Sequence, residues 1–326
     1  MTSRRWLALA AGLVLVGTGA ALLPPRRFVV AGTSMAPGLL PGDVVATGLL
    51  PLRDRLTQPR RFERWVLDAA DGTPVIKRIA GLPGETVAIA AGDLVVADRI
   101  VLKEPRQLAA MGQRVSAGHD DAAAGGERWE RPATDVLDDE PLATGGGSLL
   151  LPVRDGGVAA VVQASRPPDD AGLRVRARVA ETVFTWRLRA AGRYAIVAGR
   201  LDGHVVAVAW RLPAGAADTC PERSCLPVGP PDRWSFARPW PDRDKGDVAP
   251  ALAIVIEPAT TVAQAGAAIE RAWRWRDVLQ RGAPDGVAAW SLGPNAVFVL
   301  GDFPAESRDS RHWGPLPVGS LRHRIP

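Results

Sequence analysis

The chain has 326 residues, a length that suggests about two domains. Hydrophobic residues make up 47% and charged residues 23%, which fits a globular protein and excludes wholesale disorder. The net charge is only +5, and acidic residues are interspersed among the arginines, so the sequence argues against a nucleic-acid partner. No cysteine and histidine cluster has the spacing of metal ligands, and we expect neither a metal nor a cofactor.

The first predicted element is an uncharged run of 18 residues, Trp6–Leu23, with two arginines on each side. As a helix it would be about 27 Å long, close to the hydrocarbon thickness of a bilayer. A cleaved signal peptide is the alternative, but its apolar core is usually about 7–15 residues. We therefore predict an uncleaved anchor over residues 1–27, whose orientation the flanking arginines do not settle.

Residues 28–104 predict short strands joined by turns, because β-branched runs alternate with glycine pairs. Two of these pairs, Asp71-Gly72 and Gly92-Asp93, are hairpin signals. Residues 105–147 are polar and rich in glycine and alanine, and we interpret them as a mobile connection.

Strands return over residues 148–212, where the sequence LRVRARV predicts a sheet with one face in water. We expect one helix at about Thr261–Gln280, with Gly282 beyond its end, and a last strand beginning at Ala296. The predicted fold is mainly β: a core of residues 28–104 and 290–326, and an inserted β-rich lobe of residues 105–289 containing that helix.

Two cysteines, Cys220 and Cys225, lie in a short proline-containing loop. Their spacing suits a local disulfide in an oxidising compartment outside the cytosol, and free thiols are the alternative. Zinc would need two further ligands that this loop lacks.

The four histidines form no pattern typical of a Ser-His-Asp triad, so a serine nucleophile would need another base. Lys77 is a candidate, because a strand over VIKRI places it between Val75 and Ile79, and burial lowers the pKa of a lysine. Composition alone favours a solvated edge-strand lysine instead. The candidate serine is Ser34, in a loop of glycines and prolines about 36 Å or less from the end of Leu23.

Three segments resemble the bacterial type I signal peptidase (leader peptidase) family. The sequence GTSMAPGLLPGD is similar to the nucleophile box, VIKRIAGLPGE to the lysine box, and VFVLGDFPAESRDSRHWGPLP to the C-terminal signature. The resemblance implies a membrane-bound, mainly β serine endopeptidase with a variable inserted domain, so that residues 28–104 and 290–326 would be the catalytic core.

Within the resemblance, Ser34 would be the nucleophile and Lys77 the general base, a Ser-Lys dyad. Gly32 and Met35 would lie on the oxyanion and substrate side; Gly32 replaces a serine that supplies an oxyanion donor in some members. Ser307 would orient the lysine amine. The charged support of the dyad would consist of Arg78, Asp302, Asp309 and Arg311.

The implied function is removal of signal peptides from exported preproteins at the bilayer, with a single-pass anchor and the catalytic domain on the extracytoplasmic side of the cell membrane. Departures from the family pattern at Glu85 and Phe303 indicate a divergent branch. Two alternatives therefore stay open: a processing peptidase dedicated to one secretion or conjugation system, and a catalytically inactive, membrane-tethered binding module.

Overall fold

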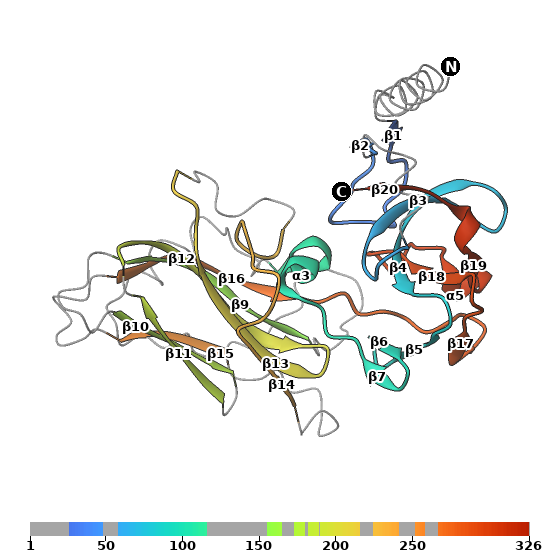
Figure 1. Ribbon diagram of the computed structural model, residues 1–326. Coiled ribbons are helices and arrows are strands. Elements are labelled where there is room, and N and C mark those ends of the chain that lie inside the picture. Colours follow the sequence, from blue (N-terminus) through green and yellow to red (C-terminus); the bar gives the residue numbers. More distant parts are fainter. Residues whose placement is uncertain are drawn as a thin grey trace, which may run out of the picture. The chain divides into compact units, whose positions relative to one another are not determined.

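The computed structural model describes residues 26–47, 58–115, 155–164, 173–179, 182–188, 190–215, 224–240, 252–257 and 267–325. The fold is mainly β, as predicted (Figure 1). The chain divides into two compact units, one of Met1–Arg99 with Gln280–Pro326 and one of Ile100–Leu279. The sequence placed these divisions after residues 104 and 289. The predicted anchor segment Trp6–Leu23 lies outside the described residues, and among those described no helix is long and apolar enough to cross a membrane.

The described residues of the first unit form three sheets. The five-stranded sheet has the order β19 (Leu316–Pro317), β18 (Ala296–Leu300), β4 (Pro74–Gly81), β3 (Arg64–Asp68) and β20 (Leu321–Ile325). A four-stranded sheet has the order β17 (Ala289–Ser291), β5 (Thr86–Ala90), β6 (Asp93–Val96) and β7 (Arg99–Ile100). The strands β1 (Arg27–Val29) and β2 (Val44–Ala46) pair alone. Two short helices, α5 (Ser310–Trp313) and the 3-10 turn η2 (Val318–Ser320), lie between β18 and β20.

Both predicted hairpins are confirmed. The strands β3 and β4 pair on either side of Asp71-Gly72, and Gly72 has a φ of +80°. Between β5 and β6, Ala91 and Gly92 both have positive φ, as a tight two-residue hairpin turn requires. Strands of both hairpins pair with strands of the C-terminal block: β3 with β20, β4 with β18, and β5 with β17.

The five-stranded sheet separates two apolar clusters of the first unit. One contains Trp65, Leu67 and Ile79 together with Val297 and Val299. The other lies around the β1–β2 pair and consists of Val30, Met35, Leu39, Val45, Val66 and Ile325, with Phe28 and Ile76 packed against it. Because side chains alternate along a strand, β4 sends Ile79 to one cluster and Ile76 to the other.

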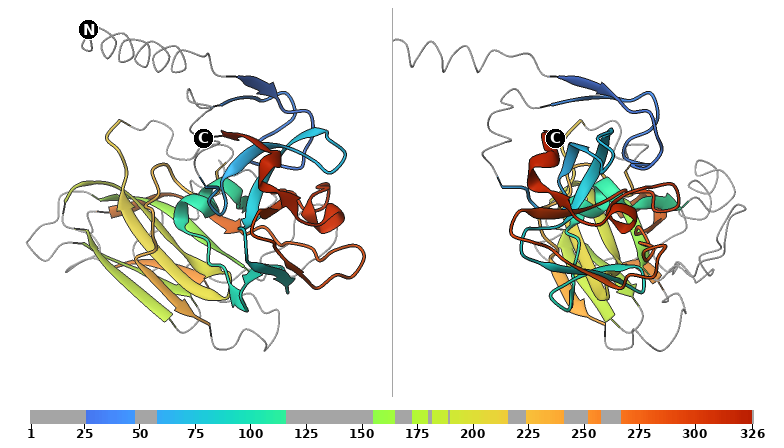
Figure 2. Two further views of the ribbon diagram at one scale, coloured as in Figure 1. Left: turned by 45° about the vertical axis from the view of Figure 1, so that its right-hand side comes forward. Right: turned by 90° about the vertical axis from the view of Figure 1, so that its right-hand side faces the viewer.

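The described residues of the second unit form two sheets. The larger has the order β14 (Phe236–Pro239), β13 (His204–Arg211), β12 (Gly192–Leu201), β9 (Gly156–Ala164), β16 (Ala267–Arg276) and β8 (Gln113–Val115). The smaller has the order β11 (Thr182–Leu188), β10 (Leu173–Val179) and β15 (Leu252–Glu257). The views in Figure 2 show the two sheets as separate layers of this unit.

Each face of the larger sheet covers its own core. Alternate residues of β9 take part in different clusters: Val158, Ala160 and Val162 pack with the smaller sheet, while Ala159 and Val161 pack with the opposite cluster. A strand buried on both faces reads as a continuous apolar run, as GGVAAVVQA does. The predicted alternation of LRVRARV is also confirmed, because Val175, Ala177 and Val179 are buried and Arg176 is exposed.

The helix predicted at Thr261–Gln280 is wrong, because residues 267–276 form β16. The alternation in AWRWR explains the error: Trp273 and Trp275 are buried, whereas Arg276 is exposed, which fits a period of two rather than 3.6. Among the described residues of this unit, a helix forms at α3 (Pro105–Met111), within the run predicted to be a mobile connection. Glu104 and Gln107 form its capping box, and Leu108 anchors it in the second cluster.

The predicted disulfide is wrong as well. Cys225 is a free thiol, fully buried in the second apolar cluster, where its Sγ donates to the carbonyl oxygen of Leu108 at 3.3 Å. Burial is the largest influence on this thiol and raises its pKa far above the usual range, so it is an inert core residue. Its intended partner, Cys220, lies outside the described residues.

Candidate active site

Ser34 lies in the tight loop between β1 and β2. The amide of Ala36 donates to the carbonyl of Thr33 at 2.8 Å, and that of Leu39 donates to the carbonyl of Met35 at 2.9 Å. Met35 and Leu39 are buried in the apolar cluster around this strand pair, with Met35 only 2% exposed. The Met35 side chain therefore belongs to the core and anchors the loop, and its place on the oxyanion and substrate side stays a prediction. Ser34 itself is partly exposed.

Lys77 lies in the middle of β4, a strand paired on both edges. Its side chain is only 3% exposed and faces the same side of the sheet as Val75 and Ile79. The interpretation of Lys77 as a solvated edge-strand lysine is therefore excluded. Its Nζ lies 2.7 Å from Ser34 Oγ and donates to Ser307 Oγ at 3.2 Å. Two hydroxyl groups are thus the direct hydrogen-bond partners that the structure shows for the amine.

Burial lowers the pKa of Lys77 from 10.5 to about 8, and the charge of Arg311 lowers it further. The carboxylates of Asp309 and Asp302 oppose this effect but do not cancel it. A pKa near the working pH gives a useful fraction of neutral amine, which is the form that can accept a proton. The site therefore places a hydroxyl within hydrogen-bond distance of a basic amine.

Ser307 connects Lys77 to a buried carboxylate. Its hydroxyl donates to Asp309 Oδ2 at 2.7 Å, so its oxygen is left to accept from the lysine amine. Asp309 Oδ2 also accepts from the Gly301 amide at 3.0 Å, and the Arg311 guanidinium binds both oxygens, at 2.8 and 2.6 Å. Desolvation raises the pKa of Asp309, but Arg311, Gly301 and Ser307 outweigh it and the net shift is downward. The carboxylate is therefore a fixed anion.

The second charged pair holds β4 in place beside the dyad. Arg78, next to Lys77 but on the opposite face of the strand, binds Asp302 through Nε at 2.7 Å and Nη2 at 2.5 Å. Its third contact, at 2.6 Å, is the carbonyl of Phe62, a residue with a φ of +67°. Arg78 and Asp302 are 5% and 1% exposed. Separating this buried pair would leave an uncompensated charge in the protein interior, which is energetically costly. The contact therefore holds β4 against the loop that follows β18.

The sequence missed three contacts that join the Ser34 loop to the C-terminal block. The amide of Phe303 donates to the Ser34 carbonyl at 3.0 Å, Thr33 Oγ1 donates to Glu306 Oε2, and Gly301 lies so close that a Cβ there would come within 2.5 Å of the Ser34 carbonyl oxygen. Each pair is more than 260 residues apart in sequence. The spacing within a sequence motif relates residues of one segment only. It gives no signal for contacts between segments that are far apart in the sequence.

Gly32 lies in open space two residues before Ser34, and a Cβ there would meet nothing within 4 Å. Gly32 has no side chain, so it offers only its backbone N–H group as a donor. Of the predicted site residues, Ser34, Lys77, Ser307, Asp309 and Arg311 form one hydrogen-bonded network. Arg78 and Asp302 form a separate pair.

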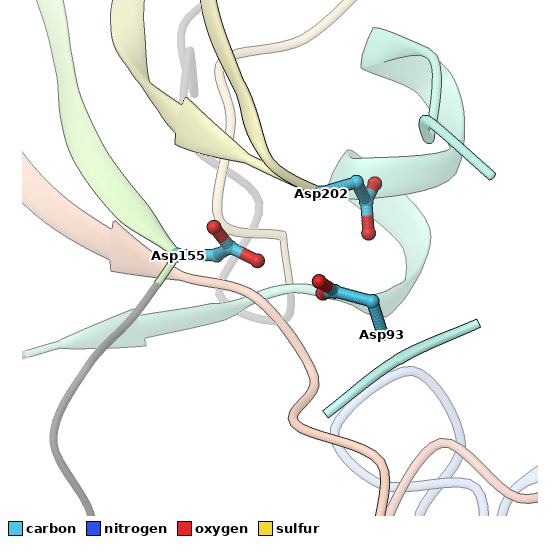
Figure 3. Close-up of side chains that lie close together, drawn as sticks. All are labelled: Asp93, Asp155 and Asp202. Atoms are coloured by element: carbon cyan, nitrogen blue, oxygen red, sulfur yellow. The ribbon is translucent and has the colours of Figure 1, made fainter. Parts of the chain in front are cut away.

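A group of carboxylates lies apart from this site. In the second unit, Asp155 and Asp202 have oxygens within 4.8 Å of each other (Figure 3). However, both oxygens of Asp202 already accept from Lys103, one from Nζ and one from the backbone amide. A protein ammonium therefore neutralises the group that a cation would need, and we assign no metal site here.

Comparison with known proteins agrees with the motifs. A family model described as signal peptidase, peptidase S26, matches residues 3–140, the part of the chain that carries the Ser34 and Lys77 motifs. No curated protein matches the chain. The matched segment and the hydrogen-bonded serine and lysine within it support the assignment of the chain to the type I signal peptidase family of serine peptidases.

Proposed function

We propose that the protein is a membrane-anchored serine endopeptidase that removes signal peptides from exported preproteins, with Ser34 as nucleophile and Lys77 as general base. The observation that carries the proposal is the 2.7 Å separation of Lys77 Nζ and Ser34 Oγ at an amine whose pKa is lowered to about 8. A neutral amine at this distance can accept the hydroxyl proton as the oxygen attacks.

In the acylation step, Ser34 Oγ forms a bond to the scissile carbonyl carbon and its proton passes to Lys77 Nζ. The negative oxygen that forms is stabilised by backbone N–H donors of the loop, including that of Ser34. The C–N bond then breaks, and the Lys77 ammonium returns the proton to the leaving amine. Ser307 orients the Lys77 amine throughout. Its hydroxyl donates its proton to Asp309, so its oxygen is available to accept from Lys77 Nζ.

In the deacylation step, water attacks the Ser34 ester. Lys77, neutral again, takes the proton of the water and then gives it to Ser34 Oγ as the ester bond breaks. The same base therefore serves twice, and each half-reaction ends with the amine neutral. This cycle needs no metal or cofactor.

The proposed substrates carry small residues one and three positions before the cut, as the substrates of this family do. An extended peptide suits a β-rich protein, because backbone groups can pair with it while shallow pockets accept alternate side chains. A bulky residue in a pocket sized for alanine costs about 1–3 kcal/mol, roughly a fivefold to hundredfold loss of rate. The proposed location is the extracytoplasmic face of the cell membrane, with one anchor over residues 1–27; the family match begins at residue 3 and includes that segment.

The test uses full-length protein in detergent and a preprotein with Ala-x-Ala after a hydrophobic segment. Wild type should release the mature protein, while Ser34→Ala and Lys77→Arg should not, since a guanidinium cannot accept the proton. Near-native circular dichroism of both variants is the control for folding. Cleavage by Ser34→Ala would refute the nucleophile, and equal cleavage of a preprotein with leucine before the cut would favour the dedicated processing peptidase. Failure of wild type to cleave any preprotein would favour the inactive binding module.

Orientation needs a separate measurement. In intact spheroplasts, an added protease should digest the folded domains of the protein, whereas in inverted vesicles the same domains should be protected. The opposite pattern would refute the extracytoplasmic location and would leave the proposed Ser-Lys dyad unaffected.

A further inference from the structure

Glu306 stands out among the charged groups of the first unit because it is exposed and lies beside the nucleophile. Thr33, the residue before Ser34, donates its hydroxyl hydrogen to Glu306 Oε2. The charges nearer the dyad are committed to each other: Asp302 to Arg78 and Asp309 to Arg311. Among the described residues, no ion pair involves Glu306.

The position of Glu306 is fixed by the backbone as well as by its side chain. Its amide donates to the carbonyl of Phe303 at 3.2 Å, and the amide of Phe303 donates to the carbonyl of Ser34 at 3.0 Å. The turn that carries Glu306 is therefore pinned to the nucleophile at two points. A charge held in this way acts at a defined place relative to the scissile bond.

A bound peptide must pass over Ser34, and its residues advance by about 3.3 Å each when it is extended. Thr33 and Ser34 have Cα atoms about 3.8 Å apart, and Glu306 is one hydrogen bond beyond the Thr33 side chain. A lysine or arginine side chain from a residue within about three positions of the cut can reach a carboxylate at that distance. An acidic side chain there would meet a like charge.

Resting on the proposed peptidase function, we propose that Glu306 determines specificity by favouring a basic side chain beside the scissile bond of the substrate. The hydrogen bond from Thr33 holds its carboxylate in place for this contact. Because Glu306 is exposed, the pairing is in high dielectric and corresponds to about 0.2–1 kcal/mol, or up to roughly a fivefold change in kcat/KM. Screening by salt should weaken it.

The test measures kcat/KM for peptides that keep alanine one and three residues before the cut. Lysine, glutamine or glutamate is placed in turn at the position between the two alanines and at each of the three positions after the cut. At one or more of these positions, wild type should cleave the lysine peptide up to about five times faster than the glutamine peptide, and the glutamate peptide more slowly still. Addition of 0.5 M NaCl should bring the three rates together.

Variants then assign the effect to Glu306. The lysine-to-glutamate ratio should fall to about one in Glu306→Gln and invert in Glu306→Lys. Thr33→Val, which keeps the side-chain shape but removes the donor, should reduce the ratio. Arg308→Gln is the matched control, because Arg308 is exposed in the same segment and the variant also removes one charge. A ratio that is unchanged in Glu306→Gln, or that Arg308→Gln changes by as much, would overturn the inference.

The ratio is measured within each variant, so a general loss of activity cancels. If wild type cleaves the glutamine peptide but shows no preference for lysine, the inference about Glu306 is wrong and the peptidase function stands. If wild type cleaves none of the peptides and no preprotein, both fail together.

Discussion

The pH dependence of cleavage is the most direct test of Lys77. With a pKa of about 8, roughly one lysine in eleven is neutral at pH 7; with the ordinary value of 10.5, the fraction would be about one in 3,000. Burial therefore raises the concentration of active base about 300-fold at neutral pH. We expect log kcat/KM to rise with a slope of about one below pH 8 and to level off above it.

The assay is the initial rate of cleavage of a quenched fluorescent peptide from pH 5.5 to 10 at constant ionic strength. The lysine peptide is unsuitable because its own charge could change, so the glutamine peptide is used. A rate that does not depend on pH, or one that rises with a midpoint near 10.5, would refute the argument that burial activates this amine.

An independent readout is protein stability. The folded state binds the Lys77 proton more weakly than the unfolded state, so the free energy of unfolding should rise as pH increases from about 8 to 10.5. The gain is at most about 3 kcal/mol, from 2.5 pKa units at 1.36 kcal/mol each. Lys77→Met should lose both this rise and all activity. A rise that persists in Lys77→Met would assign it to another group.

Two further predictions concern close packing and the second unit. Gly301→Ala should lower kcat/KM at least tenfold, because its Cβ would lie 2.5 Å from a backbone oxygen of the nucleophile loop, whereas Gly293→Ala, with open space around it, should not; equal rates in the two variants would refute this. Burial raises the pKa of Asp277 to about 6, so its folded state binds the proton more tightly, and the stability of the second unit should fall as pH rises from about 4 through 6. Hydrogen exchange of this unit should show that fall in wild type but not in Asp277→Asn; an equal fall in both would contradict it.

Local pattern predicted much of the fold. The hairpin at Asp71-Gly72 and the alternation around Arg176 depend on residues close in sequence, and both were confirmed. The strand β16 was misread because alanine-rich sequence before Trp273 has high helix propensity, while the pairing with β9 that decides its conformation comes from residues about 110 positions earlier. Tertiary pairing overrode the local preference.

The site divides in the same way. The burial of Lys77 was predictable from its neighbours Val75 and Ile79, because a strand places all three on one face. The contact of Thr33 with Glu306 had no local signal, since an exposed glutamate in a loop is usually solvated. The free thiol of Cys225 was missed for a related reason: the short spacing to Cys220 suggested a bridge, but the residue fills a core position beneath α3.

The two described buried lysines show what decides whether such a residue becomes a base. Lys77 and Lys103 are each 3% exposed, and burial lowers the pKa of both. Lys103 binds the carboxylates of Asp202 and Asp277, whose charges outweigh burial and raise its pKa far above the usual range. Lys77 binds the hydroxyls of two serines, which carry no charge, so burial prevails and its pKa falls.

The difference explains why the carboxylate of Asp309 stands one residue away from the amine instead of beside it. Ser307 hydrogen-bonds to both Asp309 and Lys77, so it orients the amine while the Asp309 carboxylate stays out of contact with it. A carboxylate bonded directly to Lys77 would hold the amine protonated, as it does in Lys103, and a protonated amine cannot remove the proton of Ser34. An interposed hydroxyl keeps the lysine oriented and still able to act as a base.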